Sequence, residues 1–73
     1  MEITLYALPT CGICKVMGMK MREKGIHFKE EPFEKIMNVI HTDHAPALQI
    51  ITDNGEIITY NSPKQIADWI NQQ

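Results

Sequence analysis

The spacing of apolar and polar positions predicts a strand followed by a helix at the start of this chain. Residues 3–8 form a short apolar run, which is typical of a buried strand. In residues 11–24, Met17 and Met21 stand four positions apart, the spacing at which helical side chains share a face toward the core. We expect Gly25 to end this helix.

The middle of the chain predicts a second strand and a second helix. Residues 26–30 alternate between apolar and polar side chains, as a half-buried strand does, and we expect Pro32 to interrupt it. Residues 33–41 then follow the spacing i, i+3, i+4, i+7 of an amphipathic helix. The apolar positions of this helix are Phe33, Ile36, Met37 and Ile40.

A hairpin and a last helix complete the prediction. Residues 47–52 and 56–60 read as two strands, and the Asp-Asn-Gly sequence at 53–55 is a hairpin turn signal. Ser62 supplies an N-cap and Pro63 a first helical residue for the segment that follows.

This order of elements predicts an α/β fold in one domain spanning residues 1–73. The first strand–helix–strand unit requires parallel strands and a right-handed crossover, whereas the terminal hairpin is antiparallel. A four-stranded mixed sheet flanked by three helices satisfies both requirements. A chain of 73 residues has room for one core and one surface site.

Charge and composition narrow the classes of partner. The formal net charge is −2, and the basic residues form no stripe of the kind that nucleic-acid binders carry. No apolar stretch approaches the roughly 20 residues of a membrane span, and residues 1–6 lack the basic start of a signal peptide. We therefore expect a cytoplasmic protein that binds neither nucleic acid nor membrane.

The two cysteines of the chain both lie in Cys11-Gly12-Ile13-Cys14. In a reducing compartment they are poor candidates for a structural disulfide, and so short a loop adds little stability. The pair follows a predicted strand and opens a predicted helix, the context that favours redox chemistry. The helix N-terminus favours a Cys11 thiolate, and Cys14, one turn further and facing Met17, would resolve the mixed disulfide.

Two other interpretations of the cysteines remain open. Structural zinc requires about four ligands, and the three histidines, His27, His41 and His44, form no second ligand pair at zinc spacing, so we expect no metal. Cys11 could nevertheless serve as a ligand in a metal or iron–sulfur module that a second subunit completes. A redox-inactive adaptor that simply binds a partner is the third hypothesis.

Pro46 is the second candidate feature of the site. The loop before the third strand reaches the same end of the sheet as Cys11. A cis Ala45–Pro46 bond would present the Ala45 backbone to an extended substrate, which would pair as an added strand. Only about 5–6% of X-Pro bonds are cis, so the base rate alone predicts trans.

The chain resembles the glutaredoxins and close glutaredoxin-like redoxins of the thioredoxin superfamily. The resemblance covers nearly the whole length, in the segments Ile3-Thr4-Leu5-Tyr6, Pro9-Thr10-Cys11-Gly12-Ile13-Cys14, Ala45-Pro46-Ala47-Leu48 and Asn54-Gly55-Glu56 and in the closing helix. It implies a thioredoxin-like fold with strand order 2-1-3-4, a Cys11 nucleophile, a Cys14 resolver and a cis peptide bond before Pro46. We expect Gly12, Ile13, Ala45 and Pro46 to be the substrate-binding residues, although Gly12-Ile13 stands where glutaredoxins commonly have Pro-Tyr.

The resemblance also implies a monomeric disulfide reductase with no bound cofactor, recharged by glutathione or by thioredoxin reductase. Leu8 stands where many glutaredoxins have a basic residue. The stretch Tyr60-Asn61-Ser62-Pro63-Lys64 lacks their Gly-Gly pair and acidic residues for glutathione. It is closer to the small redoxins that serve ribonucleotide reductase. The expected substrate is thus a disulfide-containing protein, ribonucleotide reductase among the candidates, or a glutathione mixed disulfide.

Overall fold

The strands and helices follow one another in the predicted order in the computed structural model, which describes residues 1–42 and 44–73. The strands are β1 (Glu2–Ala7), β2 (Lys29–Pro32), β3 (Ala47–Ile51) and β4 (Ile57–Tyr60). The helices are α1 (Gly12–Glu23), α2 (Glu34–Ile40) and α3 (Pro63–Asn71). None of these helices, within the described residues, has the length and apolar character that crossing a membrane requires.

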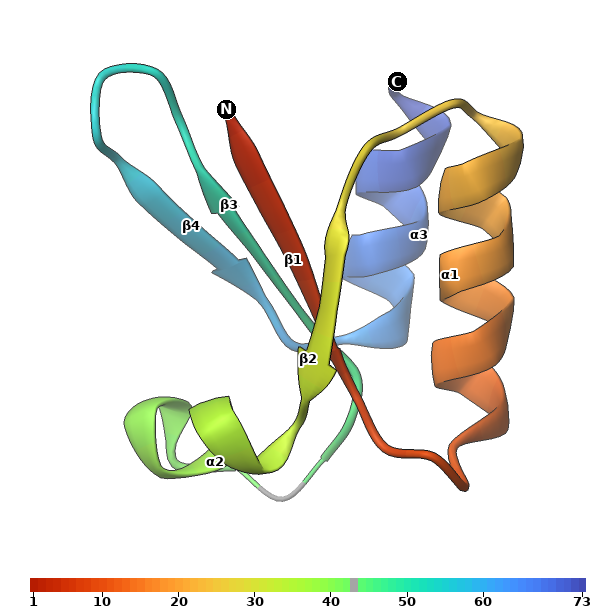
Figure 1. Ribbon diagram of the computed structural model, residues 1–73, viewed down its shortest axis with the longest axis vertical. Helices are drawn as coiled ribbons and strands as arrows, with labels where there is room; N and C mark the ends of the chain where they lie inside the picture. The colour runs from red at the N-terminus through yellow and green to blue at the C-terminus, as the bar shows by residue number, and fades with distance from the viewer. Residues whose placement is uncertain (43) are drawn as a thin grey trace.

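The strands form one mixed sheet in the order β2-β1-β3-β4 (Figure 1). β1 pairs in parallel with β2 and antiparallel with β3, and β3 pairs antiparallel with β4. The 53–55 turn closes as predicted, because Thr52 N–H donates to the Glu56 carbonyl over 2.9 Å and Gly55 adopts a φ of 87°. The predicted α/β fold, with its strand order and its helices, is confirmed.

Helices lie on both faces of the sheet, with α1 and α3 side by side on one face and α2 on the other (Figure 1). The alternation of side chains along a strand produces this division. Leu5 packs into the main core with Met17 and Met21 of α1, as the sequence predicts. The next residue, Tyr6, packs on the opposite face against the smaller cluster that contains Phe33 and Ile36.

The second strand lies further along the chain than predicted. Ile26 does not begin a strand: its N–H donates to the Met21 carbonyl, and Gly25, at a φ of 73°, donates to Arg22. These two bonds close the end of α1 in a Schellman motif. Pro32 does not interrupt the strand either but ends it, which an edge strand tolerates because its outer side needs no N–H.

Gly18 lies where α1 approaches the sheet. It is buried, and a methyl group in its place would lie 3.8 Å from Leu5 on β1 and 3.4 Å from the Glu30 side chain on β2. A larger side chain would meet these neighbours directly, so the absence of one lets the helix pack closely.

The sheet register brings three connecting segments to one end of the sheet. Tyr6, near the end of β1, pairs with Ala47 at the start of β3, and Tyr60 at the end of β4 pairs with Leu48. The loop into α1, the loop into β3 and the loop into α3 therefore all leave the sheet at this end, in the lower half of Figure 1.

Candidate functional site

A disulfide joins Cys11 to Cys14 where α1 begins. Their Cα atoms lie 5.3 Å apart, within the ordinary range for a disulfide. Cys11 is the N-cap residue, and the backbone N–H of Cys14 donates to its Sγ over 3.1 Å. The sulfur thus occupies the place of the side-chain oxygen in an ordinary helix cap, at the positive end of the helix dipole.

A tight turn places Cys11 at this position. Cys11 N–H donates to the Leu8 carbonyl over 3.1 Å, and the Cys11 carbonyl accepts from Lys15 N–H over 3.3 Å. The chain therefore turns between Leu8 and Cys11 and enters the helix immediately afterwards, because Cys11 has an extended φ of −89° and ψ of 109°. Residue 11, where the sequence predicted the helix to begin, is therefore the N-cap of α1, and the helix itself begins at Gly12.

The two sulfur-bearing residues differ in exposure. Cys11 is half-buried, whereas Cys14 is only 3% exposed. Between them, Gly12 and Ile13 face solvent, and Ile13 is 48% exposed. An approaching disulfide therefore reaches Cys11 before Cys14, and it meets an apolar side chain beside the sulfur.

A groove runs between α1 and the edge strand β2 and reaches Cys14. Met19, which lies off the core-facing side of α1, lines it with Lys15 and Leu8. The ion pair between Arg22 and Glu30 crosses the far part of this groove. Lys15 is the nearest basic residue to Cys14 in the sequence, and the first turn of α1 contains no acidic residue.

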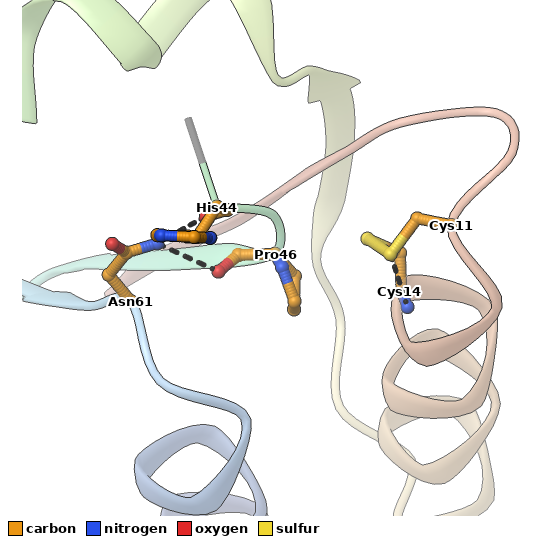
Figure 2. The surroundings of a disulfide bond; sticks show 5 residues. All are labelled: Cys11, Cys14, His44, Pro46 and Asn61. Atoms are coloured by element: carbon orange, nitrogen blue, oxygen red, sulfur yellow. Dashed lines mark hydrogen bonds between the residues drawn. A yellow bond between two sulfur atoms is a disulfide. The ribbon is translucent and has the colours of Figure 1, made fainter. Parts of the chain in front are cut away.

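The Ala45–Pro46 peptide bond is cis. The trans bond that the base rate predicts is therefore wrong, and the cis bond implied by the resemblance is present. Pro46 is buried and Ala45 half-buried, and Figure 2 shows this loop among the surroundings of the disulfide. The structure thus brings the two sequence-predicted parts of the site to the same end of the molecule.

Asn61 belongs to the stretch 60–64 noted in the sequence for its lack of glutathione-binding residues, but it was not predicted as a site residue. Its side-chain Nδ2 donates to the His44 carbonyl over 2.7 Å and to the Pro46 carbonyl over 3.1 Å (Figure 2). In the sequence, the only indication is an amide residue directly after the last strand. Its role becomes clear when β3 pairs with β4, because this pairing brings Asn61 beside His44 and Pro46.

Among the described residues, the histidines belong to no metal-binding cluster. His41 is the C-cap of α2 in a left-handed conformation, and His44 N–H donates to the Thr42 hydroxyl over 3.1 Å. Within residues 1–42 and 44–73, no three His, Cys, Asp or Glu side chains are grouped to hold a metal ion. A metal-binding role for Cys11 therefore stays a hypothesis, because the described residues bring together no group of three such ligands.

The arrangement as a whole can support thiol–disulfide exchange. It offers a half-buried cysteine, a second, buried cysteine bonded to it, and the Pro46 loop in the surroundings of the disulfide (Figure 2). The chain matches no protein-family model, and it matches no curated protein sequence.

Proposed function

We propose that this protein is a glutaredoxin-like thiol–disulfide oxidoreductase that reduces disulfides in proteins or glutathione mixed disulfides. The observation that carries the proposal is the Cys11–Cys14 disulfide at the start of α1. The sulfur of the half-buried Cys11 accepts a backbone N–H, and its partner Cys14 is buried. A hydrogen bond from an amide stabilises a sulfur anion more than a neutral thiol.

The reaction begins with the reduced protein. The Cys11 thiolate attacks one sulfur of the substrate disulfide, forming a mixed disulfide and releasing the other substrate sulfur as a thiolate. The Cys14 thiolate then attacks the Cys11 sulfur and releases the second substrate sulfur. The substrate gains two electrons, and the two cysteines, having lost two, end as the disulfide of the structure. Protons from solvent balance the released thiolates.

The substrate is proposed to bind across Gly12, Ile13, Ala45 and Pro46. Within the described part of the chain, no hydrogen bond occupies the N–H or the C=O of Ala45, so both groups are open to an extended peptide that adds as a short strand. Ile13 offers apolar contact at 48% exposure. Peptide pairing together with apolar contact favours a protein disulfide, such as that of a ribonucleotide reductase.

The electron donor is proposed to be glutathione, two molecules of which become glutathione disulfide, or a thioredoxin reductase; either returns two electrons to the Cys11–Cys14 disulfide. Turnover assays with each donor, using insulin and a glutathione mixed disulfide as substrates side by side, test the proposal. We expect turnover with at least one combination. Absence of turnover in all four would refute the enzymatic function.

A metal assay on the same preparation distinguishes the proposed oxidoreductase from the alternative hypothesis, a metal-binding module. Protein purified without oxygen should show no visible absorption and less than stoichiometric zinc or iron. A stoichiometric metal lost in the Cys11→Ser variant, together with no turnover, would instead support a metal-binding module.

A further inference from the structure

The side chain of Asn61 joins two segments that are distant in the sequence. One nitrogen atom, Nδ2, donates to the carbonyls of His44 and Pro46, which precede Asn61 by 17 and 15 residues. Asn61 directly follows β4, and the pairing of Tyr60 with Leu48 places it beside the residues that lead into β3. The contact therefore follows from the sheet register.

The two carbonyls that accept from Asn61 lie on either side of Ala45 (Figure 2). Both are occupied by the side chain of Asn61, in the loop that precedes α3. Pro46 has no N–H to offer. The peptide groups left open in this segment are therefore the N–H and C=O of Ala45, and their direction depends on the orientation of the two flanking carbonyls.

We propose that Asn61 is a positioning residue for peptide substrates, acting through the backbone of Ala45. The inference rests on the proposed function, because it assigns the substrate-pairing backbone to Ala45. By holding the neighbouring carbonyls in one orientation, Asn61 lowers the cost of ordering the segment when a substrate strand pairs with it. The substrate class is an extended cysteine-containing peptide.

The chemistry of the contact requires a carboxamide. Two N–H groups on one nitrogen reach two acceptors at once, whereas a carboxylate of the same shape has no donor and would face both carbonyl oxygens. Asn61→Asp therefore removes the contact while keeping the volume. The adjacent Ser62 makes no side-chain hydrogen bond to the helix it precedes, so Ser62→Ala is the matched control in the same loop.

The test compares kcat/KM for two substrates in wild type, Asn61→Asp and Ser62→Ala. One is a cysteine-containing peptide disulfide, and the other is 2-hydroxyethyl disulfide, which has no peptide groups to pair. We expect Asn61→Asp to lower the ratio of peptide to small-disulfide kcat/KM about tenfold, equivalent to about 1.4 kcal/mol, mainly through KM. Ser62→Ala should keep the wild-type ratio.

An unchanged ratio in a folded Asn61→Asp protein would overturn the proposal, whereas a wild type that reduces neither substrate would overturn the proposed function itself. A measurement on wild type covers the case in which the variant does not fold. The side-chain amide protons of Asn61 should exchange with solvent more slowly than those of the exposed Asn38. Equal exchange rates would also overturn the proposal.

Discussion

The backbone N–H of Cys14 points at the sulfur of Cys11, with 3.1 Å between nitrogen and Sγ. One cysteine thus contributes to the site twice, through its own sulfur and through the amide that caps its partner. The relationship depends only on the helix beginning at Gly12, so the start of the helix and the geometry of the dithiol are set together.

Replacing each cysteine in turn should separate their roles. We expect Cys11→Ser to abolish turnover, because the accessible sulfur is gone. Cys14→Ser should instead accumulate a mixed disulfide between Cys11 and the substrate, since nothing resolves it. Mass spectrometry of the protein after mixing with a peptide disulfide detects this adduct. Full dithiol-dependent activity in Cys11→Ser would contradict the assignment.

The amide contact predicts how the reduced protein titrates. We expect the pKa of the Cys11 thiol to lie below its ordinary value of about 8.5, because the Cys14 N–H and the helix dipole favour the anion. The rate of alkylation by iodoacetamide, followed against pH in Cys14→Ser, measures this pKa. The same variant in guanidinium chloride is the control. Equal values in the folded and denatured protein would show that the helix start exerts no such effect.

Gly18 should tolerate one added methyl group and no more. Gly18→Ala removes the helix cost of glycine, and its methyl meets only the movable ends of the Glu30 and Arg22 side chains and the Leu5 methyl at contact distance. We expect a gain of about 1 kcal/mol, seen as a rise in Tm of roughly 4–8 °C. Gly18→Leu should lose about 1–3 kcal/mol through overpacking. A loss of stability in Gly18→Ala would show that the helix and the sheet leave no room for the methyl group.

The ion pair between the N-terminal ammonium and Asp53 predicts how the stability of the folded protein depends on pH. Hydrogen bonding from the ammonium, and secondarily its charge, lowers the pKa of the Asp53 carboxyl. When folding lowers the pKa of a carboxyl, the ionised group stabilises the folded protein. This stabilisation is complete at pH values above the pKa in the unfolded protein, about 3.9. It is lost as the pH falls through the pKa in the folded protein.

Asp53→Asn should therefore be slightly less stable than wild type at pH 7, and the difference should vanish in strong acid. Urea unfolding at several pH values measures it. Because Asp53 is 91% exposed, salt should also shrink the difference. A difference that grows toward acid pH would contradict the expected direction of the effect.

Local pattern was enough to predict most of the fold. The strand containing Leu5, the helix containing Met17 and Met21, and the turn at Gly55 all depend on neighbours within a few positions. The second strand was misplaced for a local reason as well. Ile26 has the apolar character of a strand residue, but its N–H completes the end of α1, and its side chain packs on the core from a non-strand position.

In the candidate site, too, local sequence predicts some residues and not others. Cys11 and Cys14 stand out because their spacing and position carry chemistry in the sequence itself. The isomer at Pro46 does not follow from the residues around it, since the base rate favours trans. Asn61 was missed because its partners lie 15 and 17 residues earlier and meet it only once β3 and β4 have paired.

The outer strand β2 has a consequence for how copies of the protein meet. It contains only Lys29, Glu30, Glu31 and Pro32, three charges followed by a residue without an N–H. Short, charged, proline-ended strands discourage a second molecule from extending the sheet. Concentrated solutions should consequently resist edge-to-edge aggregation along the β2 side of the sheet.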